Sequence, residues 1–186
     1  MKLSNRTQRL EGERVELLRH IRANYPLYGE WYGDPEIWHL TSWAAEPLGA
    51  KAVQRLFEQR ESSITDDSFA IHRKGQRHPI GIVSLMNISE VHASADLSII
   101  VGRQGDRDQG YGSEAIEALL EYSFESLGLH RVGLSVFDFN ALTISAYEKL
   151  GFREEGRLRQ AIKRDHAFHD AILMSILRPE CRKSRS

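Results

Sequence analysis

The chain has 186 residues, of which 41% are hydrophobic and 27% are charged, and this balance is typical of one folded domain. Its 25 basic and 26 acidic side chains nearly cancel, and no apolar run approaches the roughly 20 residues that cross a bilayer, so we expect neither a nucleic acid nor a membrane partner. The single cysteine, Cys181, excludes an internal disulfide and, with an N-terminus that lacks the apolar core of a signal peptide, predicts a cytoplasmic protein.

The first third of the chain has the least regular pattern. Residues 14–21 (RVELLRHI) predict a short strand that runs into a helix. The aromatic-rich segment 24–43 contains two prolines and two glycines, which exclude one continuous helix. Residues 49–63 place apolar side chains at helical spacing between polar ones, which predicts a surface helix.

From residue 68 the pattern becomes regular. Two β-rich segments flank a turn at Gly75, which predicts a hairpin over 68–88. Strand and helix signals then alternate, predicting strands over 95–102 and 130–137 and helices over 110–128 and 140–151. The segments 152–156 and 168–177 predict a last antiparallel pair with its turn at 163–168.

This order of elements predicts a mixed α/β fold. A strand–helix–strand–helix order places the strands side by side and packs the helices on the sheet. We expect a single domain over residues 1–186, with a flexible tail from about residue 179.

The segment 107–115 (RDQGYGSEA) places two glycines between a predicted strand and the start of a predicted helix. A helix that begins in this way exposes backbone N–H groups at the positive end of its dipole, which suits a phosphate or pyrophosphate. Gly110 and Gly112 let an anion approach the amides closely, and Arg107 adds a charged donor. The alternative is a pair of turn glycines without a ligand. The spacing fits neither GxxxxGK[ST] nor GxGxxG, which disfavours a P-loop and a dinucleotide site.

Arg107, Gly110 and Gly112 match the RxxGxG signature of the GCN5-related N-acetyltransferases (GNAT), and residues 140–152 resemble the asparagine-containing segment and YEKLGF sequence of that family. The run 80–177 resembles the subgroup of ribosomal-protein N-terminal and spermidine acetyltransferases. This resemblance implies a mixed, mostly antiparallel central sheet with helices on both faces.

The resemblance also implies an activity. Such an enzyme transfers the acetyl group of acetyl-coenzyme A to a primary amine by direct attack in a ternary complex. A protein N-terminal amine or a polyamine-like small amine is the expected acceptor. Alternative acceptors are an amino sugar and an aminoglycoside-like antibiotic. Alternative functions of the protein are a non-catalytic acetyl-CoA-binding module and a nucleotide-binding module.

The resemblance implies that the coenzyme contacts the main chain of the strand before the loop, the loop itself and one asparagine. These positions are Ile99, Ile100, Val101, Arg107, Gln109, Gly110, Tyr111, Gly112, Ser113 and Asn140. We also expect Asn140 to cap the helix that follows it. Tyr147 matches the residue that protonates the departing sulfur, and its alternative role is a half-buried helix tyrosine that fills core space.

Asp96 is the expected base. It lies where the subgroup carries a glutamate, and its side chain is one methylene shorter, which favours a water relay or a role in binding a cationic amine. The alternative is a solvated acidic residue beside a strand. Glu90 and His92, in the preceding turn, are alternates for the same role.

The aromatic-rich segment is expected to divide between the core and an acceptor pocket. Its aromatic residues are Tyr25, Tyr28, Trp31, Tyr32, Trp38 and Trp43. With interleaved carboxylates they suit a cationic amine, so Tyr28, Glu30 and Trp31, together with Glu90, are the expected acceptor contacts. An acidic face over an aromatic core is the alternative, and an exposed aromatic surface is also compatible with a homodimer. The His166 and His169 pair lacks further ligands, so we expect no metal.

Overall fold

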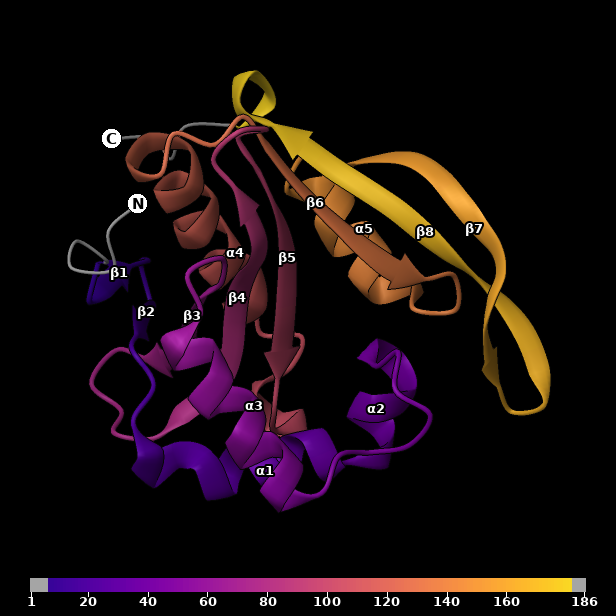
Figure 1. The fold of residues 1–186 in the computed structure, drawn as a ribbon, viewed down its shortest axis with the longest axis horizontal. Helices are drawn as coiled ribbons and strands as arrows, with labels where there is room; N and C mark the ends of the chain where they lie inside the picture. The colour runs from indigo at the N-terminus through magenta and orange to yellow at the C-terminus, as the bar shows by residue number, and fades with distance from the viewer. Residues whose placement is uncertain (1–6, 182–186) are drawn as a thin grey trace.

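The computed structural model describes residues 7–181 and contains one eight-stranded mixed sheet (Figure 1). The strands are β1 (Arg9–Glu11), β2 (Val15–Leu18), β3 (Asp67–Arg73), β4 (Pro79–Ser89), β5 (Ser94–Val101), β6 (Arg131–Phe137), β7 (Arg153–Arg164) and β8 (Ala167–Leu177). Their order in the sheet is β1-β2-β3-β4-β5-β6-β8-β7. Among the strands of the described residues, β5 and β6 form the only parallel pair. This arrangement confirms the predicted mixed α/β class.

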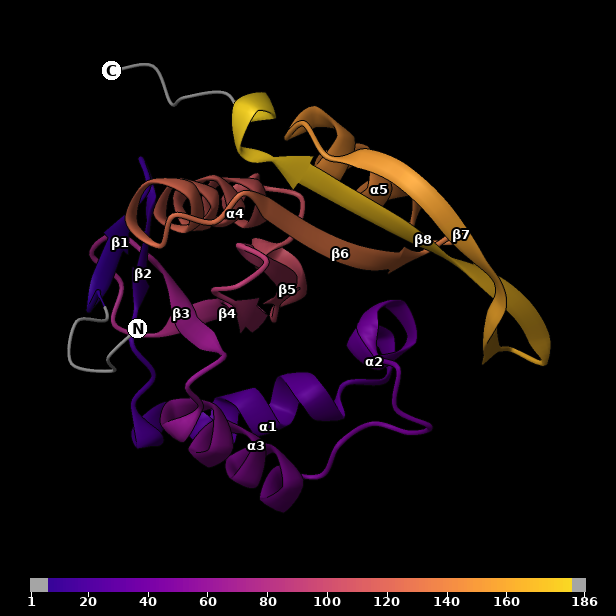
Figure 2. The same cartoon turned by 45° about the horizontal axis from the view of Figure 1, so that its top comes forward.

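Helices cover both faces of the sheet (Figure 2). They are α1 (Tyr25–Gly33), α2 (Pro35–Thr41), α3 (Ala50–Ser62), α4 (Tyr111–Glu121) and α5 (Ala141–Lys149). Helix α4 packs on the face opposite α1 and α3. Across residues 7–181, no helix combines the length and apolar character that a membrane span requires.

Two apolar clusters fix this layering. One joins α4 and α5 to the sheet, with Leu97, Leu119 and Leu134 among its buried residues. The other lies beneath the sheet between α1 and α3, where Tyr28 and Phe57 are fully buried. Along a strand, side chains alternate between the two faces. The sheet therefore separates the two clusters and contributes a different set of side chains to each.

The aromatic-rich segment forms two helices instead of one, as its prolines and glycines predicted. Pro26 and Pro35 lie in the first turns of α1 and α2, where a missing N–H costs no intrahelical bond. Between them, Asp34 caps α2 by accepting a hydrogen bond from the N–H of Glu36 at 2.7 Å.

Some element bounds differ from the prediction. The predicted helix 110–128 is α-helical to Glu121 and continues as the π-helical turn η4 (Tyr122–Ser126). The strand predicted from residue 14 is β2, and the helical residues after it are the short 3-10 helix η2 (Arg22–Asn24) before α1. At the C-terminus β8 ends in the 3-10 turn η5 (Arg178–Glu180), and the rest of the predicted flexible tail lies outside the described residues.

Candidate active site

Strands β5 and β6 part after three residue pairs, and this seam sets the position of the site. Ser94, Ala95 and Asp96 of β5 pair with residues 131–133 of β6. Beyond Asp96, β5 stays on β4 while β6 follows β8, so the two strands diverge (Figure 1). Every second residue of 97–101 therefore directs its backbone N–H and C=O groups into the gap, away from β4.

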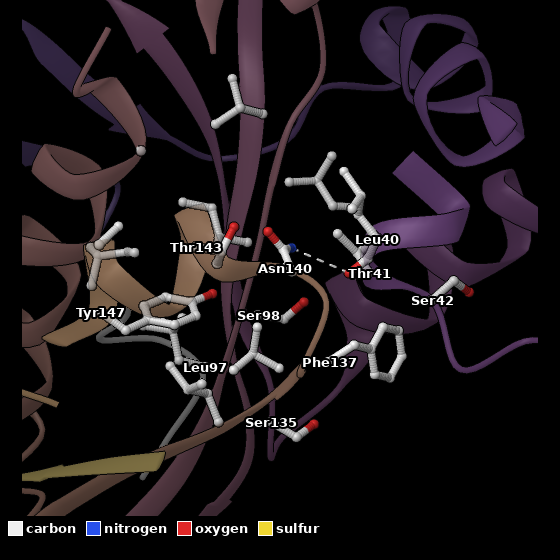
Figure 3. A pocket seen from close by; sticks show the side chains of 18 of the residues that line it. Leu40, Thr41, Ser42, Leu97, Ser98, Ser135, Phe137, Asn140, Thr143 and Tyr147 are labelled. Carbon is white, nitrogen blue, oxygen red and sulfur yellow. Dashed lines mark hydrogen bonds between the residues drawn. The ribbon is translucent and has the colours of Figure 1, made fainter. Parts of the chain in front are cut away.

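A pocket of about 840 Å³ fills the gap between the diverging strands. Its walls come from β5, β6, α2, α5 and the first turn of α4 (Figure 3). Ile99, Ile100 and Val101, predicted as coenzyme contacts, are in its lining. The Ile100 side chain packs in the cluster beneath the sheet, so what Ile100 presents to the gap is its main chain.

The glycine loop delivers the N-terminus of α4 to the pocket. Gly110 is the residue before the helix and has φ +82°, a left-handed conformation that glycine adopts without strain. None of the described side chains caps this helix. Gly112 and Ser113 line the pocket, and a Cβ on Gly112 would lie 3.3 Å from Val101 Cγ2, so the helix packs closely on β5. The first-turn N–H groups are thus oriented for an anion.

The other predicted loop residues lie behind this turn and outside the pocket lining. The carbonyl of Gln109 accepts a hydrogen bond from Arg14 Nη1 at 3.2 Å, and the Arg14 guanidinium stacks 4.9 Å from the centre of the Tyr111 ring. Glu114 accepts hydrogen bonds from Arg14 Nε and from the N–H of Val15, both at 3.0 Å. These contacts fix α4 against β2 and hold the loop in place.

Arg107 joins the end of β5 to α2. Its Nε and Nη2 donate to the carbonyls of Val101 and Gly102 at 3.2 and 3.0 Å. Its Nη1 donates to Glu36 Oε2 at 2.8 Å. The guanidinium lines the pocket and is largely buried.

Tyr147 and Asn140 face the pocket from the α5 side. Figure 3 shows the Tyr147 hydroxyl directed into the pocket. The residue is 7% exposed, its ring packs on Phe152, and its hydroxyl bonds to none of the described residues. Burial raises the pKa of this hydroxyl, so it stays protonated at neutral pH. Asn140 Nδ2 donates to the carbonyl of Leu40 at 3.4 Å, so this side chain joins α5 to α2 and does not cap α5 as expected.

Asp96 lies at the seam on the sheet face that α1 and α3 cover. Asn87 Nδ2 donates to Asp96 Oδ2 at 2.9 Å. Asn87 has φ +53° at an irregularity in the β4–β5 register, and its N–H bonds to Asp66 Oδ1 at 3.1 Å. A Cβ on Gly133 would lie 3.6 Å from Asp96 Oδ1 and from Arg131 Nη2. Asp96 lines the pocket, and its Oδ1 forms no hydrogen bond with the described residues.

Arg131 and Glu155 form an ion pair on the same face. Both Arg131 amino groups donate to Glu155 at 2.5 Å, and the Ser175 hydroxyl donates to the same carboxylate at 2.7 Å. These hydrogen bonds, that from Arg131 first, lower the pKa of Glu155 to about 2. Glu155 is therefore ionised and already paired.

Helix α2 and the segment after it close the far side of the pocket. Arg164 is 5% exposed, stacks 4.0 Å from the centre of the Trp38 ring and donates to the carbonyl of Ser42. Trp43, which is half exposed, packs edge-on to Phe137 at a ring distance of 5.2 Å.

The predicted acceptor contacts lie elsewhere. Tyr28 and Trp31 are 0% and 3% exposed in the cluster beneath the sheet, because the helical turn of α1 directs them onto Phe57 and β5. Glu30 and Glu90 are exposed and do not line the pocket. This corrects the expectation that these four residues form the acceptor pocket.

The pocket contains residues that the sequence analysis did not assign to it. Arg60 lines it and follows Val53 and Phe57 by seven and three positions, so a charged residue on the apolar stripe of a helix was the available signal. Arg131 falls on the polar side of an alternating strand. Glu155 gave no such signal.

Comparison with known proteins gives consistent matches. The family described as an acetyltransferase (GNAT) domain matches residues 14–153. A Vibrio cholerae protein named spermidine N(1)-acetyltransferase is 29% identical over 139 residues, which are 74% of this chain and 79% of that protein. A Bacillus licheniformis protein named uncharacterized N-acetyltransferase p20 is 30% identical over 171 residues, 90% of this chain and 95% of that protein. The crystal structure of spermidine N-acetyltransferase from Vibrio cholerae in complex with CoA and spermine aligns with a TM-score of 0.82 at 26% identity, covering 90% of this chain and 97% of that one.

Proposed function

This chain belongs to the GNAT acetyltransferase family, and from that membership we propose that it transfers acetyl from acetyl-coenzyme A to a primary amine by direct attack in a ternary complex. The observation that carries the proposal is the seam at Asp96 and Gly133, where the sheet opens between a free strand edge and the N-terminus of α4. An anionic group and an extended amide chain are complementary to these two surfaces.

The residues at the seam fit this co-substrate. The first turn of α4, with Gly112 and Ser113, would hold the pyrophosphate, supported by Arg107. The main chain of 97–101 would pair with the pantetheine arm and donate to the carbonyl of the thioester. When bound, acetyl-coenzyme A supplies the electrophilic carbonyl carbon.

Two side chains handle protons on opposite faces of the sheet. The Tyr147 hydroxyl, protonated at neutral pH and directed into the pocket, donates its proton to the departing thiolate. On the other face Asp96 Oδ1 receives the proton of the attacking amine, directly or through one water. Cys181 directly follows η5 and is outside the pocket lining, so the proposal includes no acyl-enzyme.

The acceptor is proposed as a class. A polyamine is supported by the names of the Vibrio cholerae relatives. A protein N-terminal amine presents the same nucleophile and is the second candidate.

The test is release of coenzyme A thiol from acetyl-coenzyme A by the purified chain. The acceptors are polyamines, N-terminal peptides, amino sugars and aminoglycosides, and parallel titrations measure binding of acetyl-coenzyme A and of ATP. We expect turnover with at least one amine class. Tight coenzyme binding without turnover on any amine would favour the non-catalytic alternative, and tighter binding of ATP would contradict the family-based function.

A further inference from the structure

The charged side chains on the acceptor side of the pocket do not match a polycation. Asp96, Ser98 and Ile100 alternate with Leu97 and Ile99, so Asp96 shares the sheet face of α1 and α3. The charged lining residues that come from α3, β5, β6 and β7 are Arg60, Asp96, Arg131 and Glu155, while Glu36 of α2 is paired with Arg107 at 2.8 Å. Two positive and two negative charges give no net attraction for an acceptor with several ammonium groups.

One of the two carboxylates is already used. Glu155 accepts both amino groups of Arg131 at 2.5 Å and the Ser175 hydroxyl at 2.7 Å. Of the two carboxylates beside Met86 and β6, Asp96 is thus the one that no described arginine pairs with. A polyamine bound there would place its second ammonium group without a counter-ion.

Arg60 is the remaining charge, and within residues 7–181 no carboxylate pairs with it. At the end of α3 it is half-buried, its Nη1 donates to the Tyr32 hydroxyl at 3.2 Å, and its Nη2 lies 3.8 Å from Met86 Sδ. None of the described carboxylates forms a salt bridge with it. A guanidinium stays charged and presents five donors in a plane, a geometry that fits a carboxylate or phosphate.

The fold brings this free cation close to Asp96. Met86 touches Arg60 and is the residue of β4 paired directly with Asp96. Side chains of directly paired residues lie side by side on one face of a sheet. A small molecule seated over Met86 therefore meets a carboxylate at one end and a guanidinium at the other.

From this arrangement we infer that the acceptor carries an anionic group within a few bonds of its amine, with Arg60 binding the anion while Asp96 receives the amine. The inference rests on the proposed acetyl transfer and narrows its acceptor to amino-acid-like amines or acidic peptide N-termini, in preference to polyamines.

The experiment compares acceptors that carry this charge with acceptors that lack it. The first pair is leucine and leucinamide. The second pair is a tetrapeptide with aspartate at its second position and the same peptide with asparagine there. Spermidine is measured alongside both pairs. We expect kcat/KM for at least one acidic acceptor to exceed that of its amide partner and of spermidine by roughly 10-fold, as for one charge-assisted hydrogen bond.

Variants then assign the preference to Arg60. Arg60→Gln should bring the acid-to-amide ratio to about one, while Arg55→Gln, which removes the same charge from an exposed position on α3, should leave it unchanged. A purely structural role of Arg60 would lower both acceptors together and keep their ratio, which would overturn the inference.

The remaining outcomes distinguish a failure of this inference from a failure of the proposed acetyl transfer. Spermidine or the amides as better acceptors than either acid would overturn the inference while supporting acetyl transfer. No turnover on any amine would overturn the proposed function, and the inference with it.

Discussion

The Tyr147 hydroxyl lies in the pocket without a hydrogen-bond partner among the described residues, and its ring is held by Phe152. Tyr147→Phe removes the oxygen and keeps the packing. We expect kcat to fall by about 10²- to 10⁴-fold, the usual contribution of a general acid, with little change in coenzyme affinity. Steady-state kinetics and a coenzyme titration measure both quantities. Because burial raises the pKa of Tyr147, the wild-type rate should show no loss from tyrosine ionisation up to about pH 10. Full activity of the phenylalanine variant across pH would remove Tyr147 from the mechanism.

Asn87 holds one oxygen of Asp96 from an unusual backbone position. Because φ at Asn87 is +53°, Asn87→Gly keeps the conformation and removes only the side-chain amide. We expect kcat/KM for the acceptor to fall by roughly 10-fold, since the carboxylate loses a hydrogen bond to a charged group. In an Asp96→Ala background the same change should have no further effect. If the two losses multiply instead, Asn87 acts on the fold and not through Asp96.

At the scale of single residues, the sequence motifs indicated some of the residues that line the pocket. Arg107, Gly112 and Tyr147 line the pocket, as their motifs indicated, and their roles stay predictions. The residues of the acceptor side could not be predicted from the sequence. The rotation of α1 and α2 about their axes decides which of their aromatic side chains are buried in the core, and this rotation depends on tertiary packing. Trp31 is buried, and Trp38 lines the pocket.

At the scale of the elements, the last residue pair before β5 and β6 part contains a glycine, Gly133. A Cβ on Gly133 would meet its neighbours at 3.6 Å or more, so Gly133→Ala should fold with unchanged thermal stability. The added methyl would occupy the space beside Asp96 Oδ1. We expect kcat/KM for the acceptor to fall on the order of 10-fold while coenzyme affinity is kept.

The control for this variant is Gly156→Ala, in β7, where a Cβ would meet nothing within 4 Å. Equal effects of the two alanines on acceptor kinetics, or a loss of coenzyme binding in Gly133→Ala alone, would contradict the placement of the acceptor at the seam.

Most elements were predictable, but their junctions were not. The hairpin at Gly75 and the strand–helix–strand run through α4 follow from local patterns. The parting of β5 and β6 after three pairs is a choice between partners distant in sequence, so no local pattern encodes it. The π-helical end of α4 likewise carries no periodicity of its own.

His20 links β2, α1 and β3 and makes the stability of the whole molecule depend on pH. Its ring bonds to the Tyr28 hydroxyl at 3.0 Å and to the Ser68 hydroxyl at 2.8 Å. Burial, with the charges of Arg60 and Arg19, lowers its pKa to about 3. The folded protein therefore binds this proton less well than the unfolded chain, whose histidine pKa is about 6.5. Stability from this group is complete above pH 6.5 and decreases as the pH falls from there toward 3.

Urea unfolding at pH 7 and pH 5 measures this effect. His20 should contribute up to about 1.4 kcal/mol per pH unit to the loss of unfolding free energy. We expect His20→Gln to be less stable at pH 7 and to show a shallower pH dependence, whereas His78→Gln, at an exposed position, should behave as the wild type. The same slope in all three proteins would contradict the assignment.

The three β5–β6 residue pairs also affect how wide the pocket is at its mouth. Past Gly133, β6 extends four residues to Phe137, about 13 Å at the rise of a strand, so a 10° rotation at the three paired residues would move its tip by about 2 Å. A small rotation at these three residue pairs would thus change the distance between β5 and the end of β6 at the pocket mouth. Mutations that alter the stiffness of these three pairs would then act on the access of both substrates without touching either one.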